Sequence, residues 1–165
     1  MCIRDRLQSG GAAAINQIDL DHDVPDDLEP IEANARRLVQ VLINLVGNAI
    51  KYAEAGRILV RVVAAPGTNR PERIDVVDEG PGIPAADYEA VFEPFRRGTE
   101  SSDRGTGSGL GLTISRSMCL AMGFELLVDS VVGDGTTFSI LLVDEASQPA
   151  HVPIRLLQTG DATRS

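Results

Sequence analysis

Apolar residues recur along this chain with two different periods, which divide it into alternating strands and helices. Between Glu32 and Tyr52 they return every three or four positions, at 38, 41, 42, 45, 46, 49 and 50. This spacing predicts one amphipathic helix, which Asn34 is suited to cap. A similar pattern at 110, 114, 118 and 121 or 122 predicts a second helix that ends at Gly123.

Strands are predicted where the period falls to two or where short β-branched runs are bounded by turn residues. Residues 15–24 alternate apolar and acidic side chains until Pro25, which predicts a half-exposed strand. The other predicted strands form two hairpins, 57–65 with 73–80, and 124–131 with 136–143 through the turn VGDG. A short helix over 84–92 and a polar, glycine-rich loop over 96–109 complete the order. The pattern predicts a two-layer α+β fold with helices on one face of a mixed sheet.

Composition restricts the classes of function. The chain has 165 residues and a net charge of -9, so one domain is expected and a general nucleic-acid-binding surface is not. No apolar run approaches about eighteen residues, which predicts a soluble piece without direct membrane contact. The opening MCIRDR resembles a translated sequencing adapter, so residues 1–6 are set aside as an artefact. We expect a domain over 7–145 that belonged to a longer protein, and a disordered tail over 146–165.

Setting aside Cys2 leaves Cys119 as the only cysteine, inside a helical pattern. This excludes a disulfide framework and agrees with a reducing, cytoplasmic location. Cys119 is expected to be a small core residue.

The first helix carries a polar stripe of Gln40, Asn44, Asn48 and Lys51, spaced by four, four and three. Such a stripe is often only the solvent side of a helix. Asn, however, is a weak helix former, and Lys51 is the only lysine in the chain. Amide oxygens suit Mg²⁺ and an ammonium suits phosphate, so the stripe favours a metal-triphosphate site.

Two loops strengthen this interpretation. DEGPGI begins with Asp78 at a strand end, where a carboxylate can accept from an exocyclic amine and glycines admit a flat ring. GTGSGLGL, over 105–112, places glycines before a helix, where free backbone amides can bind an anion. Each loop alone is weak evidence, since acidic turns and flexible glycine linkers are common.

The five segments QVLINLVGNAIKY, DEGPGI, VFEPFRRG, GTGSGLGL and GDGTTF occur in this order. They resemble the N, G1, F, G2 and G3 boxes of the catalytic ATP-binding domain of bacterial sensor histidine kinases. The resemblance implies the Bergerat (GHKL) fold, with about three helices on one face of the sheet and a mobile lid over ATP. The cofactors that it implies are ATP and Mg²⁺.

The resemblance also assigns roles to individual residues. Asn48, with Asn44 nearby, is the implied Mg²⁺ ligand, and Asp78 is the carboxylate that reads adenine. Arg97 is the residue that can reach the terminal phosphate, and Phe92 and Phe95 anchor the lid. The full implied ATP-binding set is Asn44, Asn48, Lys51, Tyr52, Asp78, Gly80, Gly82, Ile83, Arg97, Gly107, Gly109, Leu110, Gly111, Leu112 and Thr137. Glu79 departs from the Asn common at its position, which leaves its role open.

The related gyrase-type and mismatch-repair ATPases carry a catalytic glutamate where this chain has Asn44. Its absence predicts slow hydrolysis, with ATP kept for another nucleophile. In histidine kinases that nucleophile is a histidine on a dimerisation domain, which we expect upstream, since His22 and His151 lie in unsuitable patterns. The implied partners are that domain and the receiver domain of a response regulator. Whether the parent protein is anchored in the inner membrane is left open.

Two other functions remain open at this point. An anti-sigma-type serine kinase would share the fold without needing a histidine domain, although the F box favours the histidine kinase. A non-catalytic ATP-binding module is the other alternative, against which the intact boxes argue. Acid lability of the phosphorylated product separates the two kinases.

Overall fold

The computed structural model describes residues 18–53, 56–94 and 110–142. The predicted adapter and tail, and the lid loop 96–109, lie outside these ranges. The described elements are β1 (Ile18–Asp23), α1 (Ala35–Tyr52), β2 (Gly56–Ala64), β3 (Pro71–Asp78), η2 (Ala85–Asp87), η3 (Ala90–Phe92), α2 (Gly111–Ala121), β4 (Glu125–Val131) and β5 (Gly135–Leu141). None of the helices within the described ranges combines the length and the apolar character that crossing a bilayer requires.

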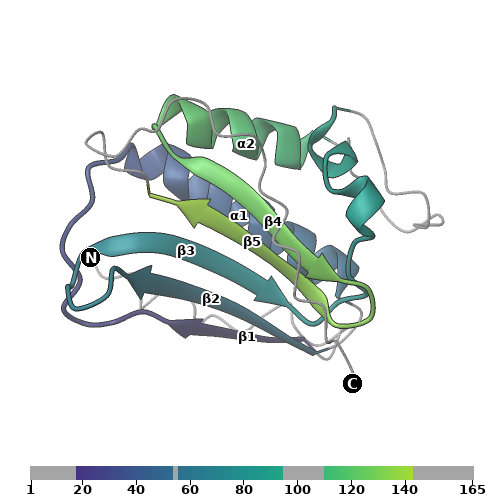
Figure 1. Cartoon of the computed structure of the whole chain (residues 1–165), viewed down its shortest axis with the longest axis horizontal. Helices are drawn as coiled ribbons and strands as arrows, with labels where there is room; N and C mark the ends of the chain where they lie inside the picture. Colours follow the sequence, from purple (N-terminus) through teal and green to yellow (C-terminus); the bar gives the residue numbers. More distant parts are fainter. Residues whose placement is uncertain (1–17, 54–55, 95–109, 143–165) are drawn as a thin grey trace, which may run out of the picture.

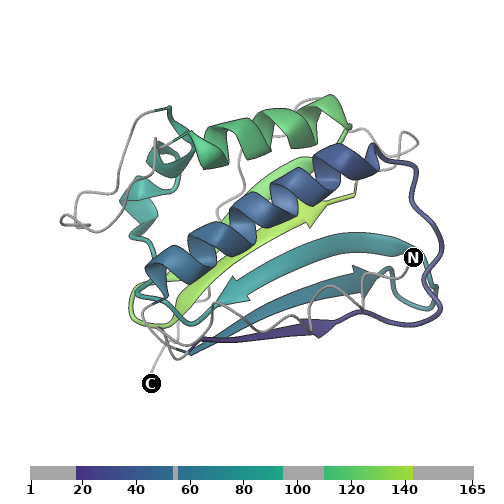
Figure 2. The same ribbon diagram turned by 180° about the vertical axis from the view of Figure 1, so that it is seen from behind.

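The strands form one five-stranded mixed sheet in the order β1-β2-β3-β5-β4. β1 pairs with β2 in parallel, and the β2–β3, β3–β5 and β4–β5 pairs are antiparallel. Both predicted hairpins are therefore confirmed. Figures 1 and 2 show α1 and α2 side by side on one face of this sheet, which confirms the predicted two-layer α+β fold.

Helix α1 begins where the sequence predicts a cap. The Oδ1 atom of Asn34 accepts from the backbone N of Arg37 at 3.1 Å, which satisfies one of the free amides of the first turn. Val41, Leu45 and Ala49 form the buried stripe. Ile50, predicted on the same face, is 42% exposed, because position 50 lies about 100° around the helix from Ala49.

Helix α2 buries a different face from the one predicted. Ser115 and Cys119 are fully buried, whereas Ile114 is 43% exposed. The prediction failed because the buried face contains a serine, which apolar periodicity does not count. Cys119 is a core residue, as expected.

The core fills the space between the two layers. Its buried members come from both helices, from four strands and from the segment after α2: Val41, Leu45, Ala49, Ile58, Ile74, Val76, Cys119, Phe124, Leu126, Phe138 and Ile140. The predicted short helix over 84–92 is present as η2 and η3, two turns of 3₁₀ helix. Phe92 anchors η3 to this core, with its ring edge-on to Phe138 at a centroid distance of 6.4 Å.

Candidate functional site

The polar stripe of α1 has two distinct parts. In the first, Gln40 Nε2 donates to Asn44 Oδ1 and Asn44 Nδ2 donates to Ser115 Oγ, both at 3.3 Å. Asn44 therefore connects α1 to α2, and its bond explains the buried serine. In the second, Asn48 is half-buried and its carboxamide has no hydrogen-bond partner among residues 18–53, 56–94 and 110–142. An amide oxygen of this kind suits a hard cation such as Mg²⁺.

The end of α1 brings a cation next to that amide. Lys51 lies three residues after Asn48, on the same side of the helix, and its side chain is exposed. Its Nζ lies 5.0 Å from the ring centroid of Tyr52, which is 44% exposed. Asn48 and Lys51 thus fit the magnesium and phosphate roles, while both ends of the Asn44 carboxamide already have protein partners.

Asp78 lies in a row of side chains that crosses the sheet. Strand pairing places Ile58, Asp78, Thr136 and Ser130 next to one another. Direct cross-strand partners point to the same face, and here this face carries the helices. The next row toward the middle of the sheet is apolar and comprises Val60, Val76, Phe138 and Val128. The polar row therefore marks the end of the core.

Burial determines the charge behaviour of Asp78, whose residue is only 7% exposed. Desolvation raises the pKa of this carboxyl group above its ordinary value, and hydrogen bonds from the backbone amides of Gly80 and Thr136 oppose the shift. The Gly80 amide donates to Oδ1 at 2.9 Å. Asp78 is thus a pre-oriented acceptor in a poorly solvated place.

Glycines allow the backbone to approach Asp78 closely. A Cβ added to Gly80 would lie 2.7 Å from Asp78 Oδ1 and 3.5 Å from the Cα of Ala53, which follows α1. A Cβ on Gly135 would lie 2.0 Å from the carbonyl oxygen of Asp78. The Asp78 turn therefore packs against the end of α1, about 7.5 Å along the helix axis from Asn48.

The turn over residues 78–83, which contains the G1 motif, and the β4–β5 hairpin are hydrogen-bonded to each other and form one unit. Gly133 N donates to Pro81 O at 2.8 Å, and Ile83 N donates to Ser130 Oγ at 2.8 Å. Gly82 has a φ of +76°, and a Cβ there would lie 2.2 Å from Val131 O. The two motifs, which the sequence separates by about fifty residues, are in direct contact here.

Thr137 does not join the row, although it was predicted to lie near adenine. It pairs with Val77 and Asp129, on the face of the sheet opposite Asp78. Thr136 is the threonine beside Asp78, and it is 6% exposed. Counting alternate positions back from the buried Phe138 would have identified it.

Ser130 and Tyr88 are also parts of this unit that the sequence did not reveal. The hydroxyl of Tyr88 accepts from Ser130 N at 3.0 Å and donates to Ser130 O. The only signal for Ser130 was a polar residue at an inward position of a predicted strand. Tyr88 gave no recognisable signal.

Glu79 acquires a polar role in the structure. Its Oε2 accepts from the backbone N of Arg57 at 2.9 Å, and a Cβ on the neighbouring Gly56 would lie 2.8 Å from the same oxygen. Glu79 therefore fastens the turn after Asp78 to the first residues of β2.

The phosphate side is described in part. Leu110 and Leu112 are half-buried, and Gly111 begins α2 without a side-chain cap at Leu110. The first amides of such a helix suit an anion. Thr113 Oγ1 donates to Phe92 O at 2.8 Å, which ties this helix start to η3. The predicted residues Arg97, Gly107 and Gly109 lie outside the described residues, as does Phe95.

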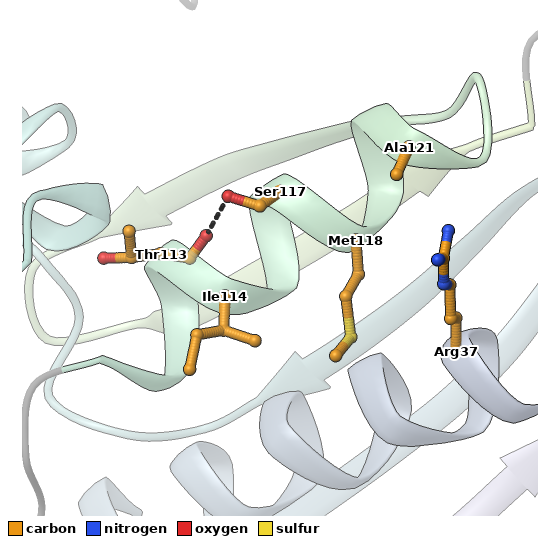
Figure 3. A pocket seen from close by; sticks show the side chains of 6 residues that line it. All are labelled: Arg37, Thr113, Ile114, Ser117, Met118 and Ala121. Atoms are coloured by element: carbon orange, nitrogen blue, oxygen red, sulfur yellow. Dashed lines mark hydrogen bonds between the residues drawn. The ribbon is translucent and has the colours of Figure 1, made fainter.

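A groove of about 320 Å³ lies elsewhere, between the first turn of α1 and the outer side of α2 (Figure 3). It is lined by Arg37, Thr113, Ile114, Ser117, Met118 and Ala121. None of the predicted ATP-binding residues lines it, so it is separate from the row around Asp78.

The profile of the family described as histidine kinase-, DNA gyrase B-, and HSP90-like ATPase matches residues 33–146. The chain belongs to this family. It is 34% identical over 125 residues to the adaptive-response sensory kinase SasA of Prochlorococcus marinus subsp. pastoris, a match that covers 75% of this chain and 33% of SasA. It is 44% identical over 104 residues to the sensor histidine kinase AruS of Pseudomonas aeruginosa, covering 61% of this chain and 10% of AruS.

Solved structures agree with this assignment. Full-length ShkA in complex with AMPPNP matches with a TM-score of 0.63 and 34% identity, covering 74% of this chain and 25% of ShkA. The catalytic domain of the histidine kinase ThkA matches with a TM-score of 0.59 and 30% identity, covering 75% of this chain and 78% of that domain. The chain therefore carries the ATP-binding catalytic domain of the histidine kinase type, which spans a third or less of SasA and AruS.

Proposed function

We propose that this chain binds ATP with Mg²⁺ and transfers the terminal phosphoryl group to a histidine on the dimerisation domain of a two-component sensor kinase. The observation that carries the proposal is Asp78, a buried and pre-oriented carboxylate with Thr136 beside it and the end of α1 packed against its turn. The phosphohistidine would then pass its phosphoryl group to the receiver domain of a response regulator. The proposed site of action is the cytoplasm.

Asp78 would accept from the exocyclic amine of adenine, and Gly80 and Gly82 would leave room for the flat ring. Ile83 would line the ring, its backbone held by Ser130. Asn48 would hold Mg²⁺, which supplies charge neutralisation at the phosphates, and Lys51 would add a second positive charge. Arg97, Gly107 and Gly109 keep their proposed phosphate contacts from the resemblance alone.

The surroundings of Asn44 support phosphoryl transfer rather than hydrolysis. A carboxamide is not a general base, and the Asn44 amide is bonded to Gln40 and Ser115 rather than directed by a neighbouring acid. Without a base to activate water, catalysis rests on position and charge neutralisation for a nucleophile brought by another domain.

Isothermal titration with ATP tests the binding part. Binding should require MgCl₂ in the unmodified chain, and Asn48→Ala should abolish this requirement for the metal along with most of the affinity. Asp78→Asn should weaken ATP binding about tenfold or more, because it removes a charge-assisted hydrogen bond. The matched control is Asp129→Asn, an exposed acid on the opposite face, which should leave affinity unchanged. Unchanged ATP affinity in Asp78→Asn would contradict the proposal.

Radiolabelled ATP tests the transfer step, with the chain fused downstream of the dimerisation domain of AruS. The label should appear on protein, disappear in acid and survive in alkali, as phosphohistidine does. An acid-stable label would instead assign the domain to the serine kinase class.

A further inference from the structure

Ser130 lies at the end of the row that contains Asp78, and its hydroxyl has three neighbours. The Oγ atom is 2.8 Å from Ile83 N, 2.7 Å from Gly135 O and 2.9 Å from Thr136 Oγ1. Each of these distances is that of a hydrogen bond.

The chemistry of these neighbours determines where each proton lies. Ile83 N–H can only donate, and the Gly135 carbonyl can only accept. Since a serine hydroxyl has a single proton, Ser130 must give it to Gly135 O. The bond between Ser130 and Thr136 then needs the proton of Thr136. The hydroxyl of Thr136 is thereby directed along the row toward Ser130, away from Asp78.

The direction of the Thr136 proton determines whether its hydroxyl can donate or accept on the side that faces Asp78. With its proton engaged, Thr136 Oγ1 presents lone pairs there, as the Asp78 carboxylate does. Both residues are buried, at 6% and 7% exposure, so water compensates a mismatch poorly. A ligand group that donates, such as an amine, matches two acceptors, whereas a carbonyl oxygen faces them unpaired.

We propose that Ser130 is a specificity-determining positioning residue, which fixes the proton direction of Thr136 so that the row accepts an exocyclic amine and rejects a carbonyl. This inference rests on the proposed function, because it refines how the same site distinguishes adenine from a 6-oxopurine. Ser130 acts through Thr136 and is not assigned a contact with the nucleotide.

A purely mechanical role for Ser130 can be separated from this one. Tyr88 bonds the backbone N and O of Ser130, whereas the three bonds that orient protons use Oγ. Tyr88→Phe therefore loosens the tie between η2 and β4 but leaves the hydroxyl chain intact. Ser130→Ala removes the hydroxyl chain and the bond that holds Ile83 N, and leaves the Tyr88 tie intact; loss of the Ile83 contact alone should weaken both nucleotides alike.

The test measures the dissociation constants of ATP and inosine triphosphate, which replaces the amine by a carbonyl, for the 165-residue chain and its variants. The unmodified chain should prefer ATP. In Ser130→Ala the freed Thr136 hydroxyl can turn and donate to the carbonyl. The ratio of the dissociation constant of inosine triphosphate to that of ATP should therefore fall about three- to tenfold. Ser130→Thr should retain the preference. Ser117→Ala is the matched control, since that exposed hydroxyl bonds to Thr113 O on its own helix, away from the Asp78 row.

Tyr88→Phe should lower the melting temperature and keep the preference for ATP. If Ser130→Ala leaves the ratio of the two dissociation constants unchanged, with or without an equal loss of affinity for both nucleotides, the role of Ser130 is overturned and the proposed function stands. An unmodified chain that binds both nucleotides equally would overturn the inference but not ATP binding, whereas one that binds neither nucleotide would overturn the proposed function and the inference together.

Discussion

At the scale of single residues, the burial that supports the proposed binding role of Asp78 also has a cost in stability. Desolvation raises the pKa of its carboxyl group and so makes the ionised form less favourable. Two backbone amides offset part of that cost. The same burial that would make Asp78 a selective acceptor makes its charged form less favourable.

The sign of this effect gives a pH prediction. A carboxyl group whose pKa is raised by folding stabilises the fold while protonated, and this stabilisation is lost as the pH rises from the unfolded value of 3.8 through the folded pKa. Asp78→Asn cannot titrate. Urea unfolding across that window should therefore show the stability of Asp78→Asn rising relative to the unmodified chain with increasing pH, then levelling off. A difference in the free energy of unfolding that stays constant with pH would mean that burial does not shift the pKa of Asp78.

Glu79 gives a second prediction at this scale. Glu79→Ala leaves the backbone amide of Arg57 without its protein acceptor, which should cost about 0.5–1.5 kcal/mol in the free energy of unfolding. Glu79→Gln keeps an acceptor and should cost less. Urea unfolding measures the loss of stability in each variant. An equal loss in Glu79→Ala and Glu79→Gln would contradict a stabilising hydrogen bond from Arg57 N to Glu79.

Residue identity and residue placement differ in how well the sequence predicts them. Asp78, Gly80, Gly82 and Asn48 could be proposed from the sequence because each residue type suits a chemical requirement of its own. Thr137 was predicted to lie near adenine, but Thr136 is the one that shares a face with Asp78, since adjacent threonines look alike until strand alternation assigns each a face. Ser130 matters through its partners, which lie five or more residues away in sequence.

At the scale of elements, the face of the sheet without helices has a buried charge of its own. Asp75 is fully buried on β3, where Arg61 Nε donates to Oδ2 at 2.8 Å and Ser139 Oγ donates to Oδ1 at 2.7 Å. Arg73 Nε lies 2.8 Å from Oδ1 as an ion pair rather than an aligned hydrogen bond. These contacts join β2, β3 and β5, the strands that set the position of Asp78.

Removing this carboxylate should destabilise the sheet. Asp75→Ala leaves two arginines without their shared partner, and because their side chains are 41% and 38% exposed the expected cost is only about 1–3 kcal/mol. Thermal or urea unfolding measures it. Asp21→Ala, which breaks the exposed pair with Arg57, is the control and should have no measurable effect. Equal effects would mean that the Asp75 cluster is not a structural link.

Helix α2 gives a prediction through its buried thiol. Burial raises the pKa of Cys119 to about 11, and its side chain is fully covered. At pH 8 only about a thousandth of the thiol would be ionised. In a Cys2→Ser background, a thiol reagent should therefore modify Cys119 slowly in native buffer and rapidly in urea. Rapid native modification would show that α2 opens readily from the core.

At the scale of the whole molecule, ligand binding and folding are linked. If the chain binds Mg-ATP only when folded, a concentration a hundred times the dissociation constant adds about 2.7 kcal/mol to its apparent stability. The melting temperature should rise with ATP and MgCl₂ together and much less with either alone. Asp78→Asn should lose most of this rise, whereas Asp129→Asn should keep it.

The overall architecture was more predictable than the alignment of its parts. Strand and helix periods indicated the element order, and glycine turns indicated both hairpins, because these are local properties of the chain. The parallel pairing of β1 with β2 and the strand order β1-β2-β3-β5-β4 could not be predicted, since they depend on contacts between distant segments. The buried face of α2 was also missed, because Ser115 is satisfied by Asn44 from another helix.

The glycine contacts around Asp78 divide the site into changeable and unchangeable positions. At Gly82 and Gly135 an added carbon would meet backbone oxygen at 2.2 Å and 2.0 Å, and no choice of rotamer relieves a clash with the main chain. Variants designed to change the proposed nucleobase preference should therefore alter positions 78, 130 and 136, whose side chains can be exchanged without moving the main chain. At these two glycines the neighbouring backbone leaves room for a hydrogen atom and for no larger side chain.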